Sequence, residues 1–184
     1  MKCGQIYGIT GENGSGKTML MRVIAGLVNP SSGQLLFDGK NRVDADPNIG
    51  IMIENASLYP ELSGRENLRL LASIRKRATN EEIDQAIRRV GLEPEDKRTF
   101  RKYSLGMKQR LMLAQAIMEQ PEVLLLDEPT NAIDRKGVEL VHQIMSEEAQ
   151  RGAIVLLASH VDYDIRSLCS RVFLIEKGRL QMEV

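Results

Sequence analysis

Apolar runs that suit buried strands alternate with helical periodicity along much of this chain. Residues 5–9 alternate apolar and polar side chains and lead into a glycine-rich loop, after which residues 17–25 follow a helical pattern. Residues 123–126 and 154–158 are uninterrupted apolar runs, which is typical of parallel strands that are buried on both faces. The order strand, loop, helix, together with these runs, predicts an α/β core with a mostly parallel sheet.

The middle of the chain carries helix signals instead. Ser63 and Thr79 are each followed three residues later by a glutamate, which is the spacing of a capping box at a helix N-terminus. Gly91 suits the residue after a helix C-terminus, and a helical pattern over residues 106–119 ends before Pro121. An all-helical insertion therefore interrupts the predicted sheet.

We expect a single domain over residues 1–184. Its core comprises residues 1–56 and 121–184, and the helical insertion comprises residues 57–120. The remaining predicted elements are strands over 34–37 and 49–53, a helix over 134–149, and a closing hairpin over 173–176 and 179–182.

Composition narrows the possible partners. The 25 basic and 25 acidic side chains cancel, so no overall charge attracts the chain to nucleic acid, which is not an expected partner. The longest apolar stretches are far shorter than the roughly 18 residues of a membrane span, and a cytoplasmic location is expected. Cys3 and Cys169 lack metal-ligand spacing, which favours two reduced, packed thiols.

Residues 11–18 read GENGSGKT and fit the pattern G-x-x-x-x-G-K-[ST] between a predicted strand and a predicted helix. Glycines let backbone N–H groups converge on phosphate oxygens, and the helix N-terminus adds positive potential at the same place. Lys17 should reach the β- and γ-phosphates, and the Thr18 hydroxyl should bind Mg²⁺. The residues expected to contact ATP here are Gly11, Asn13, Gly14, Ser15, Gly16, Lys17 and Thr18.

An acidic pair follows the apolar run at residues 123–126. Asp127 stands at the carboxyl end of this predicted strand, where α/β folds bind ligands, and should hold Mg²⁺. Glu128 follows directly and is the candidate base that deprotonates the attacking water. The pair therefore predicts ATP hydrolysis as well as binding.

Residues 103–110, YSLGMKQR, narrow the class of P-loop protein. They resemble the LSGGQ-type signature of ATP-binding cassette (ABC) ATPases, with Ser104, Gly106, Lys108 and Gln109 in register. Leu105 stands at the first glycine position of that signature, and Met107 stands at the usual glutamine.

Two further segments agree with this resemblance. Residues 131–134, NAID, resemble the D-loop of the family, whose aspartate is Asp134 here. His160 follows the apolar run at 154–158, where the family has a switch histidine that contacts the γ-phosphate. His142, in the middle of a predicted helix, is interpreted as structural.

The resemblance implies a P-loop NTPase fold: a RecA-like core with an inserted helical subdomain. It also implies a head-to-tail dimer, either a homodimer or a pair of ATPase subunits, and separate transmembrane permease subunits. In such a dimer each ATP lies between residues 11–18 of one subunit and Ser104, Gly106 and Lys108 of the other. The chain would then be peripheral on the inner face of the cell membrane.

Only ten residues precede Gly11. The resemblance implies additional antiparallel strands and an adenine-stacking aromatic residue in this region, which are largely missing here. Either the chain is truncated or it is a natural short form, and we expect weak discrimination between ATP and GTP.

Residues 49–68 read IGIMIENASLYPELSGRENL and place Glu54 where the family usually has glutamine. A carboxylate at this position resembles exporters that protect bacteria from lantibiotics and bacitracin-like peptides. Glu54 is therefore expected to contribute to Mg²⁺ binding and to catalysis, and drug or peptide efflux is the expected use.

Other functions remain possible at this stage. A chromosome-maintenance ATPase would carry a long heptad insertion, which residues 57–120 lack, and a translation factor would ordinarily carry two cassettes. A non-catalytic nucleotide-binding module is the remaining alternative. Basic residues cluster at 75–77, 88–89 and 101–102 and are interpreted as solvated helix faces, with a surface that faces anionic lipid or the membrane subunit as the alternative. Met19, Met21, Met112 and Met118 are expected to fill the core.

Overall fold

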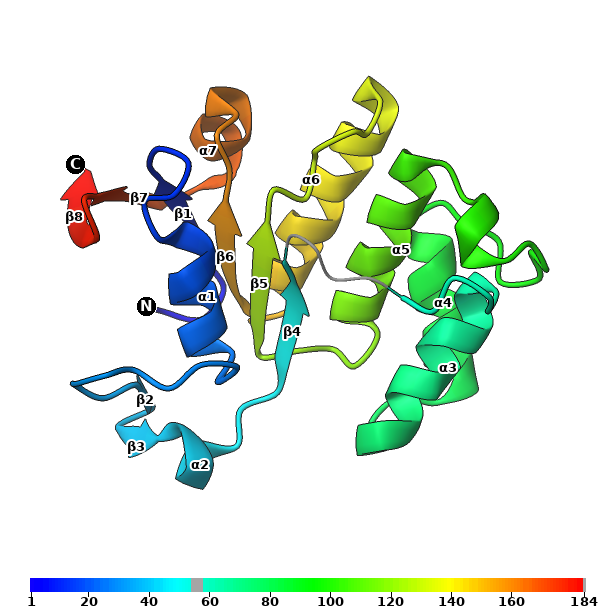
Figure 1. Cartoon of the computed structure of the whole chain (residues 1–184), viewed down its shortest axis with the longest axis horizontal. Helices are drawn as coiled ribbons and strands as arrows, with labels where there is room; N and C mark the ends of the chain where they lie inside the picture. The colour runs from blue at the N-terminus through cyan, green and yellow to red at the C-terminus, as the bar shows by residue number, and fades with distance from the viewer. Residues whose placement is uncertain (54–57, 184) are drawn as a thin grey trace.

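A computed structural model describes residues 1–53 and 58–183. Six strands form one sheet in the order β4-β5-β6-β1-β7-β8, with helices packed against it (Figure 1). These strands are β1 (Ile6–Thr10), β4 (Ile49–Met52), β5 (Val123–Asp127), β6 (Ile154–Ala158), β7 (Arg171–Glu176) and β8 (Arg179–Glu183). A separate hairpin consists of β2 (Leu36–Phe37) and β3 (Lys40–Asn41). The helices are α1 (Lys17–Ile24), α2 (Arg42–Ala45), α3 (Gly64–Arg75), α4 (Asn80–Arg89), α5 (Leu105–Ile117), α6 (Arg135–Gln150) and α7 (Asp162–Leu168), with a 3₁₀ turn at Phe100–Lys102.

The sheet is parallel from β4 through β7, and β8 returns antiparallel to β7. The register pairs Ala158 of β6 with both Ile9 of β1 and Asp127 of β5. Because parallel strands end at a common edge, the segments that follow Thr10, Asp127 and Ala158 lie side by side. This edge carries the candidate site.

The central strands are buried on both faces, as their apolar runs predict. In β5, Leu124 and Leu126 join one hydrophobic cluster with Ile144 of α6. Leu125 points to the other side of the sheet and joins a second cluster with Met21 of α1. All five side chains are fully buried. The alternation explains why β5 has no polar residue before Asp127.

Both predicted capping boxes are present. The Ser63 hydroxyl accepts a hydrogen bond from the Glu66 backbone N–H, and the Glu66 carboxylate accepts one from the Ser63 N–H at 2.8 Å. Thr79 and Glu82 repeat this arrangement at α4. Hydrogen bonds from the Ser63 hydroxyl and backbone lower the pKa of Glu66, and those from the Thr79 backbone and hydroxyl lower the pKa of Glu82.

Helices α3, α4 and α5 lie together beside the β4 edge of the sheet (Figure 1). Helix α5 approaches β4 so closely that a Cβ on Gly50 would lie 1.9 Å from the Ala116 carbonyl oxygen. An ion pair of 2.7 Å joins Arg89 of α4 to Glu148 of α6, whose side chain is 2% exposed. These contacts hold the helical insertion against the core.

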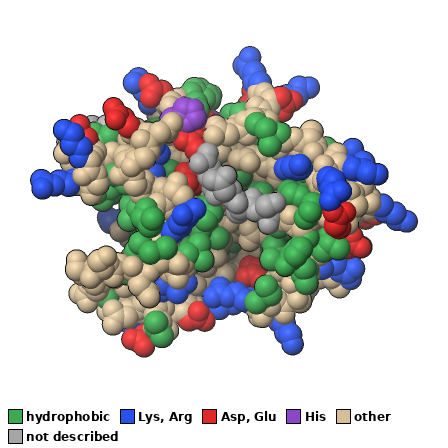
Figure 2. Space-filling view, viewed as in Figure 1, with side chains coloured by type: hydrophobic (Ala, Val, Ile, Leu, Met, Phe, Trp, Pro, Cys, Tyr) green, Lys and Arg blue, Asp and Glu red, His purple; other side chains and the backbone are tan. Residues whose placement is uncertain are grey.

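The clustered basic residues lie among acidic partners. Basic side chains are spread over the face shown in Figure 2, and several have acidic neighbours. The ion pairs in these clusters are Arg75 and Arg77 with Asp46, Arg88 with Glu95, Arg89 with Glu147 and Glu148, and Arg101 with Glu61. Within the described residues, no helix is long and apolar enough to span a bilayer.

The structure corrects several details of the sequence interpretation. The strand expected over 34–37 is limited to Leu36–Phe37, and the helix expected over 106–119 ends at Ile117. The short helices α2 and α7 were not predicted, because four and seven residues are too few to establish an apolar periodicity. Both hairpin turns, at Asp38-Gly39 and Lys177-Gly178, have positive φ at both residues, as a type I′ turn requires.

One methionine assignment is wrong. Met19 is 50% exposed, whereas Met21 is fully buried and Met112 and Met118 are nearly so. Residues two positions apart in a helix point in nearly opposite directions, so Met19 and Met21 cannot share the buried face of α1.

Candidate functional site

The glycine-rich loop joins β1 to α1 at the carboxyl edge of the sheet. Gly11, Gly14 and Gly16 have φ values of +144°, +81° and +113°, a region that favours glycine. A Cβ on Gly11 would lie 2.4 Å from the Ile175 carbonyl oxygen, so this glycine permits close packing of the loop on β7. Nothing lies within 4 Å of a Cβ placed on Gly14 or Gly16, which leaves their backbone open to a ligand.

Lys17 is the first residue of α1, and its side chain folds back over this loop. Its Nζ donates to the carbonyl oxygens of Gly11, at 2.6 Å, and Glu12, at 3.2 Å. The residue is 7% exposed. A buried ammonium group is therefore held beside the open glycines, at the N-terminus of a helix, where negative charge is favoured.

Thr18 and Asp127 meet across the junction of α1 and β5. The Thr18 hydroxyl donates to Oδ2 of Asp127 at 2.5 Å, and Asp127 is 3% exposed at the end of its strand. A hydroxyl and a carboxylate held together provide the hard oxygen ligands that Mg²⁺ prefers. The oxygen atoms present thus fit a magnesium ion, and the open glycines beside Lys17 fit the phosphates of a nucleotide.

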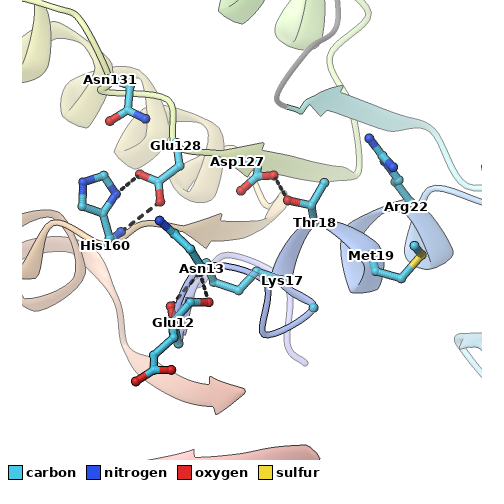
Figure 3. A pocket seen from close by; sticks show the side chains of 13 residues that line it. Glu12, Asn13, Lys17, Thr18, Met19, Arg22, Asp127, Glu128, Asn131 and His160 are labelled. Atoms are coloured by element: carbon cyan, nitrogen blue, oxygen red, sulfur yellow. Dashed lines mark hydrogen bonds and ion pairs between the residues drawn. The ribbon is translucent and has the colours of Figure 1, made fainter. Parts of the chain in front are cut away.

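Glu128 and His160 form a second pair at the same edge. Figure 3 shows their side chains pointing toward each other from the ends of β5 and β6. The His160 backbone N–H donates to Oε1 of Glu128 at 3.1 Å, and its ring Nδ1 lies 2.8 Å from Oε2. Glu128 is 8% exposed and has a φ of +51°, a conformation that is unusual for a residue with a side chain.

These groups surround one cavity of about 770 Å³ (Figure 3). Its lining contains predicted site residues from all four segments: the glycine loop, the start of α1, the end of β5 and the end of β6. They are Gly11, Asn13, Gly14, Gly16, Lys17, Thr18, Asp127, Glu128 and His160. Ser15 belongs to the loop, but it is not among the residues that line the cavity.

The predicted signature residues and Asp134 of the D-loop lie outside the cavity lining, whereas Asn131 of the D-loop is part of it. Ser104 is the N-cap of α5 and accepts a hydrogen bond from the Met107 N–H, and Lys108 places its ammonium 5.5 Å from the Phe100 ring centroid. Asp134 is the N-cap of α6 and accepts from Gly137. Ser104, Gly106, Lys108 and Asp134 are not among the described residues that line the cavity.

Sequence reasoning missed several residues at the site. Glu12, Met19, Arg22 and Asn131 also line the cavity. Glu12 lies at a variable position of the glycine motif. Arg22 comes four residues after Thr18 in α1 and therefore shares its helix face, which was the available signal for it. Gln109 of α5 donates to the Glu128 carbonyl oxygen at 3.0 Å, a contact that no local pattern indicates. The expected contribution of Glu54 falls outside the described residues.

The sequence is similar to known ATP-binding proteins of transporters. Residues 1–131 match the family model described as ABC transporter. The chain is 46% identical to the ABC transporter ATP-binding protein YybJ of Bacillus subtilis over 97% of its own length and 83% of that protein. It is 38% identical to the bacitracin transport ATP-binding protein BcrA of Bacillus licheniformis, covering 100% of the chain but 62% of the relative.

A solved structure agrees with the fold. The dimeric post-hydrolysis state of an ATP-binding cassette bound to ADP and Pi aligns with a TM-score of 0.86 at 24% identity, over 97% of this chain and 85% of the other. The α/β architecture with a mostly parallel sheet is therefore that of a P-loop NTPase.

Proposed function

This chain belongs to the ABC transporter family, and we propose that it is the subunit that binds and hydrolyses ATP to power an exporter. The observation that carries the proposal is the meeting of four segments around one cavity, with Lys17 for phosphate, Thr18 and Asp127 for metal, and the Glu128–His160 pair. A protein that only binds nucleotide would need Lys17, Thr18 and Asp127 but not the second pair. Glu128, held beside His160, supplies the base that hydrolysis requires.

Nucleotide binding uses the glycine loop and Lys17. The ATP phosphates approach the open backbone at Gly14 and Gly16, and the ammonium of Lys17 turns from the loop carbonyls to the β- and γ-phosphates. Thr18 and Asp127 would hold Mg²⁺, which neutralises charge on the phosphates. We also propose that Asn13 and Ser15 of the loop contact ATP.

Hydrolysis is assigned to Glu128 and His160. The Glu128 carboxylate accepts a proton from water while the water oxygen bonds to the γ-phosphorus. The bond from that phosphorus to the bridging oxygen breaks, which yields ADP and phosphate. His160 contacts the Glu128 carboxylate through its backbone N–H and its ring, and its side chain is 60% exposed. We assign to this side chain the contact with the γ-phosphate.

The signature residues act on a second copy of the cassette. Ser104 and Gly106 stand at an exposed helix N-terminus, outside the cavity of their own chain. In a head-to-tail dimer they and Lys108 would contact the ATP held by the partner, and Asp134 would lie at the interface. This division treats residues 57–120 as a signature subdomain on a core of residues 1–56 and 121–184.

The cargo is proposed to be an antimicrobial peptide. The similarity to a bacitracin transport ATP-binding protein supports this class, as does the Glu54 variant in the sequence. Separate permease subunits would provide the membrane path, and this chain would lie on the cytoplasmic side of the membrane against them.

Phosphate release from ATP by the purified chain, alone and with candidate permease subunits, tests the proposal. We expect Mg²⁺-dependent hydrolysis that rises when the permease is present. Lys17→Ala serves as the control for contaminating ATPases, because it removes the charge that holds the phosphates. Hydrolysis that is equal in both proteins would contradict the assignment of this cavity.

A further inference from the structure

One buried carboxylate outside the cavity touches both segments that carry Glu128 and His160. Asp164 of α7 is 1% exposed. Its Oδ2 accepts hydrogen bonds from the Thr130 hydroxyl at 2.6 Å and from the Ser159 hydroxyl at 3.2 Å. Its Oδ1 lies 2.8 Å from Nε2 of His142, which stacks on the ring of Tyr163. The two hydroxyls donate to this buried side chain, and the His142 tautomer that is protonated at Nε2 supplies a third donor to it.

The positions of these donors in the chain are informative. Thr130 comes two residues after Glu128, Ser159 comes immediately before His160, and His142 belongs to α6. A single side chain therefore joins the end of β5, the end of β6 and a helix that packs on the sheet. The Glu128 N–H also donates to the Ala158 carbonyl oxygen at 2.9 Å, so Asp164 adds side-chain restraints on Thr130 and Ser159 to a backbone bond that already joins the two strand ends.

We propose that Asp164 is a positioning residue for ATP hydrolysis, holding the Glu128 and His160 segments in the geometry in which Glu128 can activate water. The inference rests on the proposed role of Glu128 as the base. Glu128 has a φ of +51°, and such a conformation persists only where the surroundings enforce it. The bond from Thr130 to Asp164 restrains the backbone two residues beyond this strained position.

The effect should fall on turnover and leave nucleotide binding intact. Asp164 is not among the residues that line the cavity, and its hydrogen-bond partners do not include Lys17, Thr18 or Asp127. A base that moves by about 1 Å can lose roughly 100-fold in rate, because the reacting atoms no longer meet in the required geometry. Weakening one of three restraints should give part of that loss.

The sharpest test replaces the donor and keeps the shape. Thr130→Val removes the hydroxyl and keeps the branched side chain, whereas Thr130→Ser keeps the hydroxyl and loses a methyl group. We expect Thr130→Val to lower kcat by about tenfold or more, with KM and Kd for ATP within about twofold of the parent. Thr130→Ser should retain most of the parent kcat. Because a loss of folded protein would also lower the apparent kcat at constant KM, kcat is expressed per ATP-binding site measured by titration. A purely structural role would leave kcat per binding site at the parent value.

Asp164 itself is tested by Asp164→Asn, with Asp162→Asn as the matched control on the same helix, because the Asp162 side chain is 88% exposed. Asp164→Asn replaces the carboxylate with a neutral amide, which has one weaker acceptor and an N–H group and therefore weakens the hydrogen bonds at this position. We expect the kcat of Asp164→Asn to fall as in Thr130→Val and that of Asp162→Asn to stay unchanged. Combining Asp164→Asn with Thr130→Val should lower kcat by less than the product of the two separate losses, because both variants weaken the Thr130–Asp164 contact.

Glu128→Gln in the same assay tests the proposed role of Glu128 as the base separately from the positioning role of Asp164. If Glu128→Gln loses turnover while Thr130→Val hydrolyses ATP at the parent rate, the positioning role of Asp164 is wrong and the proposed function stands. If Glu128→Gln hydrolyses ATP like the parent, both are wrong. A parallel loss of kcat in Thr130→Val and Asp164→Asn, with ATP affinity preserved, supports the inference.

Discussion

Gly50→Ala tests whether α5 is fixed on the sheet by a backbone contact. A Cβ at this position would lie 1.9 Å from the Ala116 carbonyl oxygen and 2.9 Å from Cγ of Pro121. The first separation is about 1 Å shorter than the 3.0 Å that real Cβ contacts reach. A backbone carbonyl cannot rotate away as a side chain can, so β4 or α5 must shift.

The magnitude follows from what that shift disturbs. Strand β4 pairs with β5 at four positions from Ile49 to Met52, and Ala116 and Ile117 of α5 are each 1% exposed. Overpacking of this kind costs up to about 3 kcal/mol. The reduced freedom of alanine in the unfolded chain returns roughly 0.4–1 kcal/mol. We therefore expect the free energy of unfolding to fall by up to about 2–2.6 kcal/mol, and Tm to fall by up to about 4–10 °C.

Denaturant unfolding of Gly50→Ala and Gly8→Ala measures this difference. At Gly8 the nearest atoms to an added Cβ are Sγ of Cys169 at 3.0 Å and Cδ1 of Ile165 at 3.2 Å, both on side chains that can adjust. The loss at Gly8 should stay below about 1 kcal/mol. A Gly50→Ala protein that is as stable as the parent, or more stable than Gly8→Ala, would refute the packing argument.

Two further predictions concern the loop and the thiols. Lys17→Ala should weaken ATP binding by at least about tenfold in equilibrium titration, because it removes a buried ammonium from the phosphate site; an isotherm identical to the parent's would count against the loop assignment. Burial, with a smaller contribution from the Asp164 charge, raises the pKa of the Cys169 thiol to about 12. The thiol therefore stays protonated until the pH approaches that value, so iodoacetamide at pH 8 should label the exposed Cys3 and spare Cys169 in the folded protein, as peptide mass mapping can check.

The central elements were predictable because their signals are local. The apolar runs at β5 and β6 could be recognised as buried strands, and the capping boxes at Ser63 and Thr79 lie within four consecutive residues. The glycine motif marked the loop for the same reason. Its place at the strand edge followed from the parallel arrangement of β1, β5 and β6.

The remaining features depend on contacts between distant segments. Asp164 meets Thr130, His142 and Ser159 through the packing of α7 and α6, and no spacing in the sequence indicates that meeting. Met19 was misplaced because an apolar side chain was assumed to be buried, although helix geometry turns it away from Met21. Ser104 and Lys108 of the signature contact residues of their own chain, Met107 and Phe100. Their proposed contact with the ATP of a second subunit therefore stays a prediction.

The most direct test of the account compares Glu128→Gln with the parent chain for ATP binding and for turnover in the same preparation. The amide keeps the size of the side chain and removes its basicity, while Lys17, Thr18 and Asp127 stay intact. We predict an unchanged Kd for ATP, a loss of most phosphate release, and a larger dimer fraction in the presence of ATP. Phosphate release at the parent rate in Glu128→Gln would contradict the claim that this cavity hydrolyses ATP through Glu128.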